Sequence, residues 1–141
     1  MRYPLNVLVV DDEPDVVFLL AWHLQRAGYD VVTAGNGWEA LDRLRAERPD
    51  LILLDLMLPD LDGFGVCEII RRDTATATIP IIILSAWHTQ ESQQLAREFG
   101  VLEYVTKPFQ PDDLLRRIHH LTGGATAGRR SEAPVDRFAQ P

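Results

Sequence analysis

Short, continuous runs of Leu, Ile and Val recur along the chain. Four of them are pronounced and a fifth is weaker: residues 5–10, 51–54, 79–84 and 101–105, with the weaker run at 29–34. Runs that stay apolar, instead of alternating with polar residues, are typical of strands buried on both faces of a parallel sheet. The pattern therefore predicts five parallel strands.

The segments between these runs carry helix signals. Pro14 suits the first position of a helix that ends before Gly28, and Asn36 and Asp62 suit the N-caps of the next two. The four later helices are expected at residues 37–47, 63–72, 90–99 and 111–121. Alternation of strands and helices predicts an α/β fold, a doubly wound five-stranded parallel sheet flanked by five helices.

The chain length of 141 residues suits one domain. From Thr122 the composition changes to Gly, Ala, Arg, Ser and Pro. We therefore expect one domain over residues 1–121 and a C-terminal extension over 122–141, interpreted as an arm ordered by its contacts. Because the extension is short for a DNA-binding output domain, the sequence predicts a stand-alone domain.

Charge and composition narrow the partners. The formal net charge of −7 disfavours direct nucleic-acid binding. The single cysteine, Cys67, cannot form an internal disulfide, and no apolar stretch reaches the length of a membrane span. No signal peptide precedes the first strand. The sequence therefore predicts a cytoplasmic protein with no membrane partner and no direct nucleic-acid partner.

Polar residues gather where four of the predicted strands end. Asp11 and Asp12 follow the first strand, Asp55 the third, Ser85 the fourth, and Lys107 comes after the fifth. Ligands of open α/β sheets bind beyond the carboxyl ends of the strands, so these side chains are expected to share one site.

This set of residue types has a chemical logic. Clustered carboxylates attract a hard divalent cation, and Mg²⁺ often joins protein carboxylates to phosphate oxygens. A transferring phosphoryl group spreads negative charge over three oxygens, which a metal, a lysine and a hydroxyl can neutralise. Asp55 can serve as the nucleophile and form an aspartyl phosphate.

Four sequence blocks resemble the signature blocks of bacterial response-regulator receiver domains, of the single-domain type typified by chemotaxis regulators. They are VVDDE at 9–13, LLDLMLPDLDG at 53–63, LSA at 84–86 and YVTKPF at 104–109. The resemblance covers residues 5 to 121 and implies the flavodoxin-like receiver fold. It also implies a two-component phosphorelay, with a sensor histidine kinase or histidine phosphotransfer protein as the phosphoryl donor.

The resemblance assigns a role to each site residue. Asp55 is the phosphoacceptor, and Asp12, Asp55 and the Met57 backbone carbonyl bind Mg²⁺, with Asp11 positioning metal-bound water. Lys107 pairs with Asp55 and then with the phosphoryl oxygens. Ser85 and Tyr104 are the switch residues: Ser85 moves to the phosphoryl group and Tyr104 swings inward behind it. The Lys107–Pro108 bond is expected to be cis.

Phosphorylation is then expected to reshape the surface of the fourth helix, fifth strand and fifth helix for a downstream partner, which the sequence does not identify, or for a second copy in a homodimer. The domain would assist its own phosphorylation without being an enzyme for an external substrate. Trp87 lies two residues after Ser85, in the loop expected to rearrange on phosphorylation, so its large side chain is expected to cover part of the site and alter the phosphoryl lifetime. The apolar first helix suggests a docking face around Phe18.

Other functions were weighed against this one. A magnesium-dependent phosphotransferase or phosphatase with an aspartyl intermediate remains an alternative, but haloacid-dehalogenase enzymes carry a second aspartate where this chain has Met57. Gly35 and Gly37 lack the third glycine of a dinucleotide-binding fingerprint. A phosphorylation-independent interaction module is disfavoured because all the site residues are present. The simplest alternative for Asp11 and Asp12 is that they are turn and helix-capping residues with no further function.

Overall fold

The computed structural model describes residues 4–123, in which strands and helices alternate as predicted. The strands are β1 (Asn6–Val10), β2 (Asp30–Ala34), β3 (Leu51–Asp55), β4 (Ile81–Ser85) and β5 (Glu103–Thr106). The helices are α1 (Pro14–Arg26), α2 (Gly37–Glu47), α3 (Gly63–Arg72), α4 (Gln90–Glu98) and α5 (Pro111–Leu121). The predicted arm lies outside the described residues, apart from Thr122 and Gly123.

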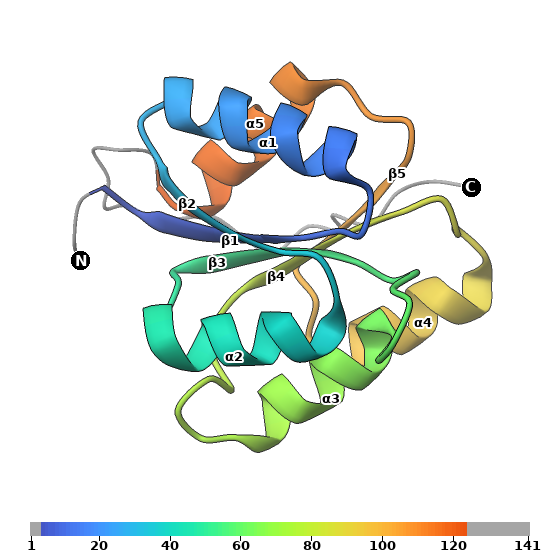
Figure 1. Cartoon of the computed structure of the whole chain (residues 1–141). Helices are drawn as coiled ribbons and strands as arrows, with labels where there is room; N and C mark the ends of the chain where they lie inside the picture. Colours follow the sequence, from blue (N-terminus) through green and yellow to red (C-terminus); the bar gives the residue numbers. More distant parts are fainter. Residues whose placement is uncertain (1–3, 124–141) are drawn as a thin grey trace.

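The five strands form one parallel sheet in the order β2-β1-β3-β4-β5. Helices α1 and α5 cover one face, and α2, α3 and α4 cover the other (Figure 1). The prediction of a doubly wound five-stranded α/β sheet with five helices is therefore confirmed. The chain reverses its direction across the sheet between β1 and β3, and open α/β sheets bind ligands at such a switch point.

Each central strand contributes to two separate cores. On β1, Val7 and Val9 pack in the cluster that contains Leu20 of α1 and Ile118 of α5. The intervening residues, Leu8 and Val10, pack in the cluster on the α2 and α3 side. Successive strand residues point to opposite faces, so burial of both faces explains why the apolar runs are continuous.

Local capping explains where the helices start. The side chains of Asn36, Asp62 and Thr89 each accept a hydrogen bond from an amide three residues further on, at the N-termini of α2, α3 and α4. Helices α1 and α5 lack such a side-chain bond and instead have a proline in the first turn. Because each helix follows a strand, all five begin at the edge where the strands end.

Three boundaries of β3 and β4 differ from the predicted ones, and the two at the strand ends concern the site. Strand β4 begins after Pro80, because proline has no amide hydrogen to donate to the ladder. Strands β3 and β4 each extend one residue further than the apolar runs, so Asp55 and Ser85 are strand residues. Asp55 pairs with Leu84, and Ser85 pairs with Thr106. The sheet itself therefore fixes the backbone of both residues.

Among the described residues, no helix is long and apolar enough to cross a membrane. The cytoplasmic location expected from the sequence stays a prediction.

Candidate functional site

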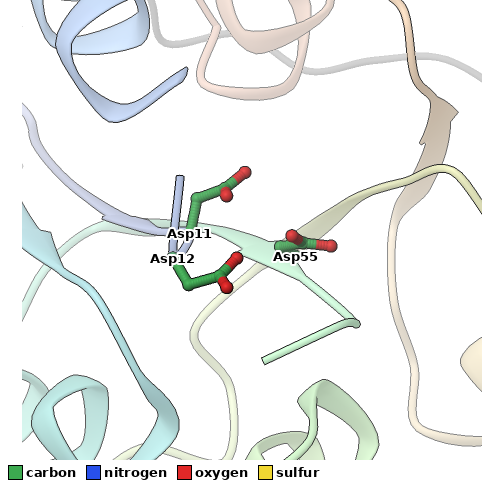
Figure 2. A group of neighbouring side chains, drawn as sticks. All are labelled: Asp11, Asp12 and Asp55. Carbon is green, nitrogen blue, oxygen red and sulfur yellow. The ribbon is translucent and has the colours of Figure 1, made fainter. Parts of the chain in front are cut away.

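Three carboxylates meet at the carboxyl edge of the sheet (Figure 2). Asp11 and Asp12 follow β1, and Asp55 is the last residue of β3. Each offers one oxygen, and these oxygens all lie within 4.8 Å of one another. Asp11 and Asp55 are buried, with 2% and 4% of their surface exposed, whereas Asp12 is exposed. The structure thus brings together the three acidic residues predicted as metal ligands.

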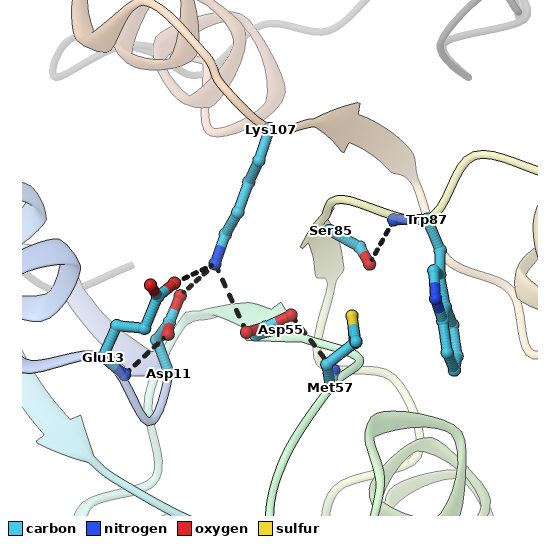
Figure 3. A network of polar contacts seen from close by, with 7 residues as sticks. All are labelled: Asp11, Glu13, Asp55, Met57, Ser85, Trp87 and Lys107. Atoms are coloured by element: carbon cyan, nitrogen blue, oxygen red, sulfur yellow. Dashed lines mark hydrogen bonds and ion pairs between the residues drawn. The ribbon is translucent and has the colours of Figure 1, made fainter.

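Lys107 supplies the positive charge facing this cluster (Figure 3). Its Nζ lies 2.7 Å from Asp11 Oδ2, 3.3 Å from Asp55 Oδ2 and 3.3 Å from Glu13 Oε1. The Lys107 amide donates a hydrogen bond to the Ser85 carbonyl at 2.9 Å, and the bond to Pro108 is cis, as expected. The β5–α5 connection is therefore anchored beside the end of β4, with the lysine side chain directed toward the acids.

The charges in this cluster shift each other's proton affinities. Burial raises the pKa of Asp55 and the charge of Asp11 raises it further, while the Met57 amide and Lys107 act in the opposite direction. Burial alone would lower the pKa of Lys107, but its contacts with Asp11, Asp55 and Glu13 outweigh burial and raise it. At neutral pH the lysine therefore stays charged and holds a group of carboxylates that repel one another.

The loop after β3 wraps around Asp55. The Met57 amide donates to Asp55 Oδ1 at 3.1 Å, and the Gly63 amide donates to the Leu56 carbonyl at 2.9 Å. A Cβ on Gly63 would come within 2.7 Å of the Asp55 carbonyl oxygen, so only glycine permits this close return of the chain. The Met57 carbonyl belongs to this loop, and its role as a metal ligand stays a prediction.

Ser85 and Tyr104, the predicted switch residues, lie on the neighbouring strands β4 and β5 and are both fully buried. The Ser85 hydroxyl accepts a hydrogen bond from the Trp87 amide at 3.0 Å. The Tyr104 hydroxyl donates to the Trp87 carbonyl at 2.6 Å, so its ring is turned into the protein. Trp87 itself is half-exposed.

The cluster fits a hard divalent cation. Its side-chain donors are carboxylate oxygens, with no thiol or imidazole among them, and its buried members have only one lysine to offset their charge. Mg²⁺ prefers oxygen ligands and is commonly held by one or two carboxylates. The donor set thus agrees with the predicted cofactor at the level of a divalent metal.

Two contacts at the site have no counterpart in the sequence analysis. Glu13, which is mostly exposed, reaches Lys107, and Ser92 of α4 lies 2.9 Å from the Tyr104 hydroxyl. The position of Glu13 directly after the acidic pair was a signal for the first contact. The second joins a helix to a strand and has no local sequence signature.

Comparison with known proteins agrees with this geometry. The family model described as response regulator receiver domain matches residues 7–119. The alkaline phosphatase synthesis transcriptional regulatory protein PhoP of Bacillus subtilis is 46% identical over 80% of this chain and 46% of its own length. The DNA-binding response regulator MtrA of Mycolicibacterium smegmatis is 41% identical over 95% of this chain and 55% of its own.

Solved structures give the same result. The Vibrio cholerae chemotaxis protein CheY4 superposes with a TM-score of 0.78 at 32% sequence identity, and the match covers 82% of this chain and 96% of that one. The predicted resemblance to receiver domains is confirmed. The chain spans about half the length of the curated relatives named above.

These comparisons contradict the expectation of no direct nucleic-acid partner, which was drawn from the net charge. PhoP is named as a transcriptional regulatory protein and MtrA as a DNA-binding response regulator. The net charge of −7 describes these 141 residues, which correspond to about half of such proteins. Charge in this half carries no information about what the other half of a relative binds, so the exclusion did not follow.

Proposed function

The chain belongs to the response regulator receiver domain family, and we propose that it is a two-component signalling switch that accepts a phosphoryl group on Asp55. The observation that carries the proposal is the placement of Asp55. Its carboxylate is almost fully buried at the end of β3, beside two further acids and 3.3 Å from the Lys107 ammonium.

In the proposed reaction Asp55 is the nucleophile. A carboxylate oxygen bonds to phosphorus, the phosphorus–nitrogen bond of a phosphohistidine donor breaks, and the imidazole keeps the electron pair. The donor is a sensor histidine kinase or a histidine phosphotransfer protein. Lys107 holds Asp55 in place beforehand and then neutralises a phosphoryl oxygen, which its proximity to both carboxylates supports.

The residues that would hold Mg²⁺ are Asp12, Asp55 and the Met57 carbonyl directly, and Asp11 would act through metal-bound water. When bound, the ion supplies positive charge that offsets the negative charge of the phosphoryl oxygens. Lys107 and the Met57 amide counter the effect of burial on the pKa of Asp55 and so favour the ionised form that attacks.

Ser85 and Tyr104 are proposed to report the phosphorylated state. Ser85 is buried at the end of β4, and its hydroxyl can turn toward a phosphoryl group on the neighbouring strand end. The ring of Tyr104 is already buried in this structure, and a phosphoryl group on Asp55 would stabilise this inward position and with it the surface formed by α4, β5 and α5. The domain assists its own phosphorylation and dephosphorylation and turns over no external substrate.

The names of the relatives favour transcription as the output. We propose that phosphorylation of this receiver likewise controls transcription, as the names of PhoP and MtrA indicate for those proteins. Comparing transcript levels in cells carrying the natural gene or its Asp55→Asn form tests this output. Identical transcript profiles would contradict it.

The decisive experiment for the chemistry is phosphorylation by a small donor. The protein and Asp55→Asn are incubated with Mg²⁺ and acetyl phosphate, and the intact mass of each is measured. The expected result is a gain of one phosphoryl group by the wild type alone, abolished by chelation of the metal. No gain in a folded wild-type protein, or an equal gain in the variant, would contradict the assignment of Asp55.

A further inference from the structure

A chain of polar groups leads away from the site toward α4. It begins at Ser85 and passes through the backbone of Trp87 to the Tyr104 hydroxyl. From there it continues to the Ser92 hydroxyl, 2.9 Å from that of Tyr104, and on to the Thr89 carbonyl, 3.0 Å from Ser92 Oγ. Thr89 is the N-cap of α4. The path thus connects a strand end at the site with the first turn of a helix.

Ser92 is one of two buried polar residues of this helix, together with Gln93. It is 7% exposed, and its hydroxyl is directed inward to a fully buried aromatic residue. A buried hydroxyl without a partner costs free energy, so an apolar side chain would be expected here if Ser92 served only to fill space. Its amide is already used by the Thr89 cap at 3.1 Å. The Ser92 hydroxyl also lies 3.2 Å from Thr89 Oγ1 and 3.0 Å from the Thr89 carbonyl oxygen, and its contact with Tyr104 extends beyond this cap.

Tyr104 is held from two sides at once. Its hydroxyl donates to the Trp87 carbonyl in the β4–α4 connection and also pairs with Ser92 in α4. Burial raises the pKa of Tyr104, so the phenol keeps its proton at neutral pH and stays a donor. The inward ring position and the placement of the first turn of α4 consequently depend on each other.

We propose that Ser92 is the positioning residue through which α4 responds to the state of Asp55. Its hydroxyl stabilises the inward position of Tyr104 and couples the position of the first turn of α4 to the position of that ring. The inference rests on the proposed function, in which the inward ring accompanies a phosphoryl group on Asp55. Since coupling is reciprocal, Ser92 then also strengthens binding of a phosphoryl group at the site, although it does not touch it.

The test is a double-mutant cycle with beryllofluoride, a small mimic of the phosphoryl group, in the presence of Mg²⁺. Its dissociation constant is measured by calorimetry for the wild type, Ser92→Ala, Tyr104→Phe and the double variant. Loss of one neutral hydrogen bond should weaken binding about five-fold in Ser92→Ala. In the Tyr104→Phe background the same substitution should have no further effect, because the hydroxyl it pairs with is gone.

Thr89→Ala serves as the matched control. It removes the cap of α4 and the contact between Thr89 Oγ1 and Ser92 Oγ at 3.2 Å, but it keeps the hydroxyls of Ser92 and Tyr104. If Ser92 acted only through the stability of the helix start, this variant would weaken binding as much as Ser92→Ala does. In addition, fluorotyrosine labelling reports the ring position directly: the ¹⁹F resonance that Tyr104→Phe removes should shift in Ser92→Ala and stay in place in Thr89→Ala.

The outcomes separate the two hypotheses. Wild-type protein that is folded but does not bind beryllofluoride contradicts the proposed function. Normal binding by the wild type together with unchanged binding in Ser92→Ala overturns only the role of Ser92. Equal weakening with and without the Tyr104 hydroxyl also overturns it, because Ser92 would then act through helix stability.

Discussion

The Lys107 ammonium lies closer to Asp11, at 2.7 Å, than to Asp55, at 3.3 Å. In this arrangement the lysine mainly compensates the buried Asp11 and makes a longer contact with the proposed phosphoacceptor. A cation bound by the acids would take over that compensation and leave the lysine available to a phosphoryl oxygen. The relationship leads to a prediction about stability.

Replacing Lys107 with methionine should lower the free energy of unfolding in EDTA by about 1.5–3 kcal/mol, the usual range for a hydrogen bond to a charged group. The carboxylates of Asp11 and Asp55 would then lose their buried counter-charge. Mg²⁺ should therefore stabilise this variant more than it stabilises the wild type. Urea denaturation with and without the metal measures both quantities.

Replacing Asp55 with asparagine should change the free energy of unfolding in the opposite direction. Burial raises the pKa of Asp55, so the folded protein holds this proton more tightly than the unfolded chain, and the ionised form at neutral pH costs stability. The variant should be more stable than the wild type in EDTA and should gain less from Mg²⁺. Equal metal stabilisation of all three proteins would contradict the placement of the cation.

Trp87 is predicted to affect the lifetime of the phosphoryl group. Its amide and carbonyl bind Ser85 and Tyr104, and these backbone contacts survive truncation of the side chain. Trp87→Ala removes a half-exposed indole near the site, so water should reach the phosphoryl group more easily and dephosphorylation should be faster. Decay of the phosphorylated mass over time measures the rate.

Trp38→Ala is the matched control for this effect. Trp38 is also exposed, but it lies at the start of α2 and not in the loop after Ser85. Its truncation should leave the decay rate unchanged. Equal rates for the wild type and Trp87→Ala would show that the indole does not limit access.

Asp60 fixes the loop that carries Met57. Its carboxylate accepts hydrogen bonds from the amides of Gly37 at 2.8 Å and Trp38 at 3.2 Å, so a residue of the β3–α3 loop caps the distant helix α2. A Cβ on Gly37 would come within 2.5 Å of the Leu61 carbonyl oxygen, which shows how closely the loop and helix approach.

Asp60→Ala should release this loop, because two helix-terminal amides lose their acceptor. We expect faster hydrogen exchange at Gly37 and Trp38 and a weaker affinity for Mg²⁺. Asp60→Asn keeps one acceptor oxygen and should lie between the two. Unchanged exchange at both amides in Asp60→Ala would contradict the role of Asp60.

Cys67 makes stability depend on alkaline pH. Burial raises the pKa of its thiol from 9.0 to about 12, so the folded protein keeps this proton after the unfolded chain has lost it. The stabilising contribution of the protonated thiol is therefore complete below pH 9 and is lost as pH rises from there toward 12. Denaturation midpoints across that range should fall less steeply in Cys67→Ala than in the wild type.

The thiol should also resist an aromatic disulfide reagent at pH 8 until the protein unfolds, since the residue is fully buried. Rapid modification of the native protein would mean that α3 opens readily.

The elements that the sequence predicted best are those set by local chemistry. Helices α2, α3 and α5 begin and end at the predicted residues, because side-chain caps at Asn36 and Asp62 and the proline at 111 act within one turn. The four site positions were also predictable, because parallel strands must end at the same edge of a sheet. Their chemical roles stay predictions.

What the sequence could not show are contacts made between elements. Glu103 lies in a predicted apolar run, yet it is buried and paired with Arg117 of α5 at 2.8 Å. The capping of α2 by Asp60 spans 23 residues, and the pairing of Ser92 with Tyr104 joins α4 to β5. Such partners are chosen by the packing of whole elements, and no spacing rule in the sequence encodes them.

The ion pair between Lys107 and Asp11 joins residues that are 96 positions apart. During synthesis from the N-terminus, Asp11 and Asp55 are made before the lysine. A nascent or truncated chain that stops short of β5 therefore has the acids without the cation that organises them. The positive side of the site is thus supplied only once β5 and the connection after it are in place.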